Sequence, residues 1–172
     1  YAVEEWTADF SKGCLMKLSA CVFDMDGTVL DSEPNYYASE KAFLGEYGIE
    51  YTEDLKRAMT GLGSKTFLGF LERRWPDNPL NALPLRERMA LKDKAYLAYS
   101  EGRTRAFPAM IHLLDLLGTQ GIPCAIASGS TLPVIETTLR WAGIRERFSA
   151  VVAAEEVPRG KPEPDIFLEA AR

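Results

Sequence analysis

The sequence has few cysteines, a single histidine, no excess of basic charge and no long apolar run. Its three cysteines, Cys14, Cys21 and Cys124, are widely spaced and form no Cys-x-x-Cys pair, which argues against a disulfide framework and against a zinc site. Lys and Arg number 20 against 25 Asp and Glu, and the net charge is −5. The basic residues are scattered, so a nucleic-acid partner is not expected.

No apolar stretch reaches the ~18 residues that are needed to span a bilayer, so we expect no membrane partner. The first ten residues carry acidic groups where a secretory signal would be basic and then apolar, so we predict no export signal and a cytoplasmic location. The 172 residues, 47% of them hydrophobic, suit one domain or a core with one insertion. The sequence leaves the oligomeric state open.

Short apolar segments alternate with helical patterns over much of the chain. Residues 18–23, 122–130 and 149–155 have the length and composition of buried strands. Amphipathic patterns predict helices over 108–121 and 132–141, and a further helix opens at residue 164. Strands that alternate with helices in this way predict an α/β fold with a parallel sheet and right-handed crossovers.

The segment from residue 34 to about residue 105 has a different character, because it is rich in Lys, Arg, Glu, Tyr and Leu at helical spacing. Apolar residues at i, i+7, i+8 and i+11 from Tyr36 share one face of a helix that Gly48 would end. Further helices are predicted over 64–75 and 85–99. We therefore predict an all-helical insertion between the first strand and the rest of the sheet.

Two aspartates follow the first predicted strand directly. Asp24 and Asp26 are i and i+2, so their side chains point the same way and can reach one site. Gly27 permits a sharp turn there, and oxygen ligands gathered at one point favour Mg²⁺. A calcium loop fits poorly, because Gly27 is fourth rather than sixth and Asn35 stands at the twelfth position. A plain turn remains an alternative.

The loops after the next two strands add an anion-binding set. The Ser128 hydroxyl and the N–H groups around Gly129 could hold an anionic oxygen, and the Lys161 ammonium could offset phosphate charge. Taken alone, a Ser-Gly loop after a strand is commonly only a turn, and a lysine in a loop is commonly only solvated. All three loops follow successive parallel strands, whose carboxyl ends form the ligand-binding edge of such sheets, so we expect them to converge there.

The segments "DMDGTVLDSEP", "IASGS" and "RGKPEPDIFLEAA" resemble the first three motifs of the haloacid dehalogenase superfamily. The resemblance is to its helical-cap subgroup, which includes sugar-phosphate phosphatases, phosphoglycolate phosphatase and beta-phosphoglucomutase. It implies a Rossmann-like parallel-sheet core with an inserted, mobile, all-helical cap. The domains would be an N-terminal extension over 1–15, a first part of the core over 16–32, the cap over 33–106 and a second part of the core over 107–172.

The same resemblance implies residue roles. Asp24 would attack phosphorus as the nucleophile, and Asp26 would act as acid and then as base. The Asp24 carboxylate and the Asp26 backbone carbonyl would hold Mg²⁺, while Ser128, Gly129 and Lys161 would bind the phosphoryl group. The implied function is Mg²⁺-dependent hydrolysis of a small phosphorylated metabolite, a sugar phosphate or a phosphoglycolate-like ester, through an aspartyl phosphate. Asp26 argues against a true dehalogenase, which lacks an acid at that position.

Two features depart from the family pattern. The fourth motif, which completes the metal site, is absent, so the C-terminal part of the core is apparently missing and the edge of the first strand would lie exposed. A non-catalytic binding module is the alternative if the chain truly ends at Arg172. Tyr36 stands where related sequences often carry a histidine, which favours hydrolysis over the other alternative, a beta-phosphoglucomutase-like phosphomutase.

The segment "MTGLGSKTF" resembles the cap loop that reaches the substrate, which makes Gly61, Gly63, Ser64 and Lys65 candidate substrate contacts. It is not a P-loop, because Ser64 stands where the motif needs glycine and no strand precedes it. An ordinary helix-capping loop remains an alternative. The only histidine, His112, is assigned no catalytic role.

Overall fold

A computed structural model describes residues 18–59 and 63–172. Its centre is a parallel sheet of β1 (Cys21–Phe23), β2 (Cys124–Ser128) and β3 (Ala150–Ala153), in the order β1-β2-β3. In the register, Val22 lies opposite Ala125. The predicted α/β class and the parallel sheet are confirmed. The first strand begins at Cys21 rather than at residue 18, since Leu18 is 53% exposed and lies outside the pairing.

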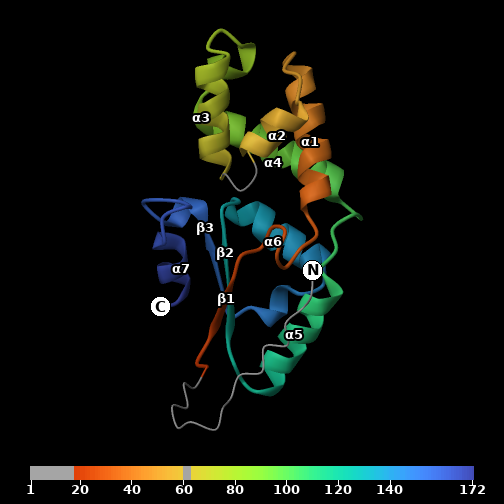
Figure 1. The fold of residues 1–172 in the computed structure, drawn as a ribbon, viewed down its shortest axis with the longest axis vertical. Helices are drawn as coiled ribbons and strands as arrows, with labels where there is room; N and C mark the ends of the chain where they lie inside the picture. The colour runs from red at the N-terminus through yellow and green to blue at the C-terminus, as the bar shows by residue number, and fades with distance from the viewer. Residues whose placement is uncertain (1–17, 60–62) are drawn as a thin grey trace, which may run out of the picture.

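Helices cover both faces of this sheet (Figure 1). The helices α5 (Pro108–Thr119) and α6 (Leu132–Trp141) lie on one face, and the short α7 (Asp165–Ala170) lies on the other. All five residues of β2 are buried, as expected for a central parallel strand that is covered on both sides. The main apolar cluster lies beneath α5 and α6 and includes Met25, Leu30, Leu114, Ile126, Ile135, Leu139 and Phe148.

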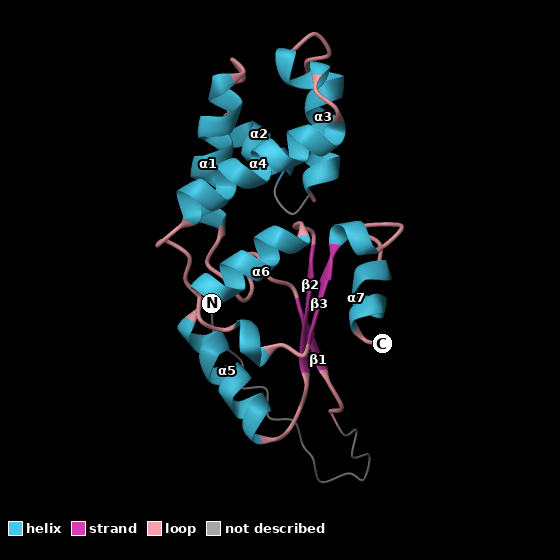
Figure 2. Cartoon of the chain, turned by 180° about the vertical axis from the view of Figure 1, so that it is seen from behind, coloured by secondary structure: helices cyan, strands magenta, loops and turns pink. Residues whose placement is uncertain are grey.

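The cap is formed by the helices that lie between the loop after β1 and the start of α5, and no strand is found among its described residues (Figure 2). Its helices are α1 (Glu33–Glu46), α2 (Glu53–Met59), α3 (Ser64–Arg74) and α4 (Leu85–Ser100). They bury an apolar cluster of their own, which includes Phe43, Leu44, Ile49, Tyr51, Phe67, Leu68, Leu71 and Leu80. The sequence pattern predicted three of these helices and missed α2, whose seven residues are too short to show a clear period.

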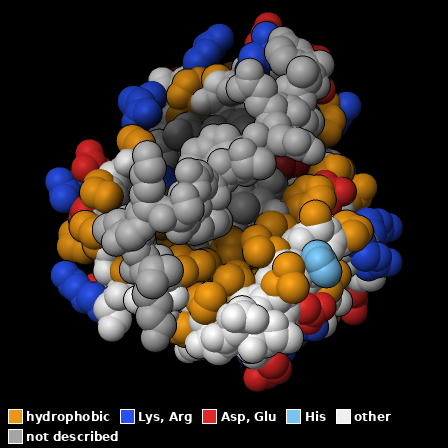
Figure 3. All heavy atoms as spheres, turned by 60° about the horizontal axis from the view of Figure 1, so that its bottom comes forward, with side chains coloured by type: hydrophobic (Ala, Val, Ile, Leu, Met, Phe, Trp, Pro, Cys, Tyr) orange, Lys and Arg blue, Asp and Glu red, His pale blue; other side chains and the backbone are white. Residues whose placement is uncertain are grey.

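Short 3-10 turns complete the secondary structure, at Pro79–Ala82 in the cap and at Arg145–Arg147 and Ala154–Glu156 in the core. None of the helices in the described part of the chain combines the length and the apolar character that crossing a membrane requires. Figure 3 views the molecule from the end opposite the cap, where the pale-blue histidine side chain lies on the surface.

Two linkers join the cap to the core, and they lie side by side. Asp31 N donates to Arg105 O at 2.9 Å, and Phe107 N donates to Val29 O at 3.1 Å. A third contact joins α4 to the start of α6, where Thr131 Oγ1 donates to Asp93 Oδ2 at 2.6 Å. The paired linkers fall next to the predicted domain boundaries at 32/33 and 106/107, which stay a prediction.

Candidate active site

The loop after β1 presents two carboxylates on one side of the chain. Met25, between them, is fully buried in the core beneath the sheet, so Asp24 and Asp26 face the opposite side, as the alternation of a strand requires. Asp24 Oδ1 accepts hydrogen bonds from Lys161 Nζ at 2.5 Å and from Met25 N at 2.8 Å. Asp24 Oδ2 accepts none from the residues that the structure describes, which leaves this oxygen available.

Serine hydroxyls surround the Asp26 carboxylate. Ser32 Oγ donates to Oδ1 at 2.7 Å, and Oδ2 accepts from Ser130 Oγ at 3.1 Å and from Ser128 Oγ at 3.4 Å. Loss of water on burial raises the pKa of Asp26, the bonds from Ser32 and Ser130 lower it in part, and the charge of Asp24 raises it further. Asp26 therefore keeps a proton to a higher pH than an ordinary aspartate, which suits a group that gives and takes protons.

Lys161 brings the loop after β3 to the same place. Its Nζ donates to Asp24 Oδ1 and also to Ala127 O, near the end of β2, at 3.1 Å. Its side chain is 19% exposed. The loops after all three strands therefore meet at one edge of the sheet, and positions 24, 128 and 161 lie together as predicted from the topology.

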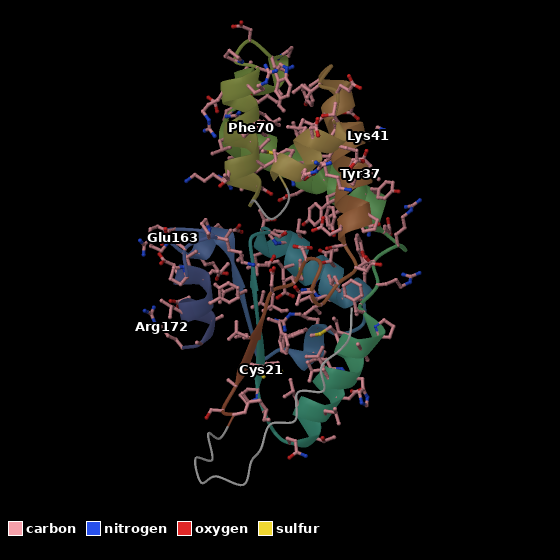
Figure 4. The ribbon with its side chains drawn as sticks, viewed as in Figure 1. Cys21, Tyr37, Lys41, Phe70, Glu163 and Arg172 are labelled. Carbon is pink, nitrogen blue, oxygen red and sulfur yellow. The ribbon has the colours of Figure 1, made fainter. Side chains whose placement is uncertain are left out.

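A cavity of about 120 Å³ lies between these loops and the cap. The core lines it with Asp24, Asp26, Gly129, Ser130 and Lys161, and the cap lines it with Glu33, Tyr36, Tyr37, Glu40, Tyr51, Lys56, Met59, Gly63, Ser64 and Lys92. Figure 4 shows Tyr37 and Lys41 projecting from α1 in the cap, and Cys21 at the end of β1 that is remote from the cap. The strand thus runs toward the cavity and ends beneath it.

The backbones of the cap and the core lie close together at two glycines, Gly63 and Gly129. A Cβ atom on Gly63 would lie 3.2 Å from the carbonyl oxygen of Gly129, a spacing that leaves little room for a side chain. Ser64 also lines the cavity, whereas Lys65 is exposed and outside the lining. Gly61 lies outside the described residues. The substrate-binding role of these cap residues stays a prediction.

Several polar residues of the cap wall were not predicted. Glu40 Oε1 pairs with Lys92 Nζ at 3.0 Å, and Glu40 Oε2 accepts a hydrogen bond from the Tyr51 hydroxyl at 2.7 Å. The sequence carries a weak signal, because side chains with polar groups recur every fourth position along α4, at Arg88, Lys92, Tyr96 and Ser100, and the structure shows all four buried with Lys92 in the cavity lining. Two members of this stripe are paired with carboxylates, Arg88 with Glu72 and Lys92 with Glu40.

The structure also places Ser128 and His112, whose predicted roles stay predictions. Ser128 is completely buried and outside the cavity lining, and its Oγ accepts from Ser130 N at 3.1 Å. Its neighbour Ser130 takes the place in the lining. His112 is exposed on α5 and away from the cavity.

The model of the haloacid dehalogenase-like hydrolase family matches residues 18–172 of this chain. The chain belongs to this family. It is 32% identical over 155 residues to fructose-1-phosphate phosphatase YqaB of Escherichia coli, which covers 88% of this chain and 78% of the relative. It is 32% identical over 164 residues to a probable pseudouridine-5'-phosphatase of Drosophila melanogaster, covering 91% and 68%.

Among solved structures, CbbY from Rhodobacter sphaeroides in complex with phosphate matches with a TM-score of 0.81 and 25% identity, over 91% of this chain and 72% of that one. The resemblance to the haloacid dehalogenase family and the predicted fold class are thereby confirmed. The phosphatases among its relatives also confirm the predicted enzyme class, that of a phosphoric monoester hydrolase.

Haloacid dehalogenase-like phosphatases generally use Mg²⁺, and the donors of this site suit that ion. No group of three or more His, Cys, Asp or Glu side chains that could hold a metal ion gathers within residues 18–59 and 63–172. Mg²⁺ does not need such a cage, because it keeps several waters and binds through one or two carboxylates together with substrate phosphate oxygens. Asp24 and Asp26 supply oxygens of that kind next to the cavity.

Proposed function

We propose that this protein hydrolyses a small phosphate monoester, a sugar phosphate or a phosphoglycolate-like ester, in a Mg²⁺-dependent reaction that passes through an aspartyl phosphate. The observation that carries the proposal is the ion pair between Lys161 Nζ and Asp24 Oδ1, 2.5 Å apart at the floor of a capped cavity that Asp26 also lines. It brings an oxygen nucleophile, a positive charge and a proton carrier within reach of one phosphoryl group. The sugar-phosphate phosphatases among the relatives support this choice of substrate.

In the first step, Asp24 Oδ2 attacks phosphorus. Its Oδ1 is held by Lys161 and by the Met25 N–H, which orients the free oxygen. The Oδ2–P bond forms and the bond from phosphorus to the leaving oxygen breaks, so the electron pair passes to the leaving oxygen. That oxygen takes a proton from Asp26, and an alcohol is released.

In the second step, a water molecule attacks phosphorus and gives a proton to Asp26. The Oδ2–P bond breaks, which frees the Asp24 carboxylate and releases inorganic phosphate. Asp26 is protonated again at the end of the cycle. One water is consumed, and one alcohol and one phosphate are produced.

The remaining groups bind and orient the phosphoryl oxygens. Lys161 would offer a positive charge and the Gly129 backbone N–H would offer a donor beside it, whereas Ser130 N already donates to Ser128 Oγ. Ser128 would act mainly by orienting Ser130 and Asp26, which it contacts directly. Bound Mg²⁺, held by the Asp24 carboxylate and the Asp26 backbone carbonyl, would add positive charge to offset that of the phosphate.

The test is to incubate the full-length protein with a hexose 1-phosphate and Mg²⁺, and to follow phosphate release and isomer formation together. We expect stoichiometric phosphate and alcohol, and loss of turnover when EDTA removes the metal. Isomer without free phosphate would overturn hydrolysis in favour of a phosphomutase.

A further inference from the structure

A chain of hydrogen bonds runs from the cap to Asp26. The Tyr36 hydroxyl, on α1, lies 2.8 Å from Ser130 Oγ, and Ser130 Oγ lies 3.1 Å from Asp26 Oδ2. Both Tyr36 and Ser130 line the cavity. Asp26 moves a proton in both proposed steps, whereas the hydroxyls of Tyr36 and Ser130 have no role of their own in them.

The direction of these bonds follows from counting protons. Ser130 Oγ donates to Asp26 Oδ2, and a serine hydroxyl has a single proton to donate, whether or not the carboxyl group of Asp26 carries its own proton. When Ser130 donates to Asp26, it must therefore accept from Tyr36. Burial raises the pKa of Tyr36 well above its usual value, so Tyr36 keeps the proton that this arrangement requires.

The cap holds the Tyr36 ring firmly in place. The ring stacks on that of Tyr96, with centroids 3.9 Å apart and planes at 16°. Lys92 Nζ lies 5.1 Å from the centroid of the Tyr36 ring and is itself paired with Glu40. The position of the phenol oxygen is thus set by α1 and α4 together, whereas the serine that it contacts belongs to the core.

We propose that Tyr36 is a positioning residue that acts on Asp26 through Ser130. By donating to Ser130 Oγ, it directs the single Ser130 proton onto Asp26 Oδ2, and with Ser32 on Oδ1 this fixes the carboxyl group in the orientation that proton transfer to the leaving oxygen needs. The inference rests on the proposed hydrolysis, since it assigns a partner to the acid of that reaction.

A positioning role for Tyr36 predicts a dependence of the rate on the leaving group that a purely structural role does not predict. A sugar alkoxide is a poor leaving group and needs a proton from the acid as the P–O bond breaks, whereas para-nitrophenolate leaves without one. Misplacing Asp26 should therefore slow the hydrolysis of a hexose phosphate much more than that of para-nitrophenyl phosphate.

The experiment measures kcat/KM, which reports the transfer of phosphate to Asp24 rather than the later hydrolysis that both esters share. It is measured on both esters for the full-length protein and for Tyr36→Phe, Ser130→Ala and the double variant. Tyr36→Phe should keep the stack on Tyr96 and lose only the hydroxyl. We expect it to lower kcat/KM for the hexose phosphate about tenfold and to change kcat/KM for para-nitrophenyl phosphate less than about twofold. The double variant should be no slower than Ser130→Ala alone, because the two hydroxyls act in series.

Tyr47→Phe is the matched control. Tyr47 packs against the apolar cluster of the cap and lies outside the cavity lining, so its variant should match the wild type on both esters. The ratio of the two rates is independent of the fraction of folded enzyme, so a partly unfolded Tyr36→Phe sample still gives a clear answer.

The experiment distinguishes a failure of the proposed hydrolysis from a failure of the role given to Tyr36. A wild-type protein that releases no phosphate from either ester overturns the proposed function and this inference with it. An active wild type whose Tyr36→Phe variant loses equally on both esters, or loses nothing on the hexose phosphate, overturns the role of Tyr36 alone. Additive losses in the double variant would also contradict it.

Discussion

The core wall and the cap wall of the cavity are built in different ways. The core wall comes from the three loops that follow the strands, and its side chains bond to one another, as Lys161 does to Asp24 and Ser130 to Asp26. The cap wall comes from α1, α2, α3 and α4, which are held by their own apolar cluster. The sheet thus positions the side chains of the core wall, whereas the packing of the cap helices sets the shape and polarity of the opposite wall.

This difference indicates a division of labour. On the core side, the Lys161 ammonium and the carboxylates lie where a phosphoryl group would react. On the cap side, the buried Lys92 is already neutralised by Glu40, which also accepts from Tyr51. Substitutions in the core wall should therefore abolish turnover on every ester, and substitutions in the cap wall should change which esters are accepted.

Asp24→Asn tests the role of the core wall and should have the largest effect. An amide is a far weaker nucleophile than a carboxylate, so we expect kcat/KM to fall by about 10³-fold or more on any phosphate ester. Steady-state phosphate release measures this loss. Asp31→Asn removes an exposed carboxylate just outside the cavity and should leave the rate near that of the wild type. Comparable activity in the two variants would refute Asp24 as the nucleophile.

Lys161→Met should have the next largest effect. It removes the positive charge beside Asp24 while keeping much of the aliphatic volume, so we expect kcat/KM to fall about 10²-fold. The same assay applies. Lys41→Met, which removes an exposed lysine of the cap (Figure 4), serves as its control and should have little effect. Equal losses of kcat/KM in the two variants would show that the ion pair between Lys161 and Asp24 does not contribute to turnover.

Gly63→Ala tests the cap wall. The added methyl group would meet the carbonyl oxygen of Gly129 at 3.2 Å, so the cap must shift slightly away from the core. We expect KM for a hexose phosphate to rise about fivefold with a smaller change in kcat, because substrate contacts with the cap are loosened. Gly45→Ala, where a methyl group would meet nothing within 4 Å, should leave KM unchanged. An unaltered KM in Gly63→Ala would show that the close approach does not limit binding.

The smallest effect concerns stability. The pKa of Asp26 is raised in the folded state, so its charged form is disfavoured there, and the free energy of unfolding falls as pH rises through that pKa. Below the unfolded pKa the carboxyl is protonated in both states and has no such effect. Asp26→Asn should therefore gain stability relative to the wild type as pH rises above the unfolded-state pKa of about 3.9.

Urea unfolding of both proteins in EDTA, at about pH 4 and at about pH 7.5, measures this difference. EDTA keeps a bound cation from lowering the pKa of the carboxyl group. A difference between the two proteins that does not change with pH would contradict the assignment of a raised pKa to Asp26.

The core wall could be predicted from the sequence because its geometry follows from local rules. Alternation along a strand places Asp24 and Asp26 on one side with Met25 inward, and parallel topology brings Lys161 to the same edge. The loop after β2 was harder, because it offers two serines. The structure places Ser130 in the lining and Ser128 beneath it, a choice that depends on the path of the turn at Gly129.

The cap wall could be predicted only as a set of helices. Glu40 meets Tyr51 and Lys92 through the packing of α1 against other parts of the cap, and no pattern within one helix specifies which neighbour its side chains will face. Tyr36 illustrates the limit, since the sequence shows it as a departure from the family pattern but does not show its bond to Ser130. Tertiary packing decides such contacts.

The most direct test of the central claim is to trap the covalent intermediate. The full-length protein is mixed with a hexose phosphate that carries labelled phosphorus, quenched in acid at millisecond intervals and digested. The account predicts a transient protein-bound phosphate that hydroxylamine releases and that maps to the peptide containing Asp24. Complete release of phosphate in a single turnover with no labelled protein at any time, or a label on another peptide, would contradict it.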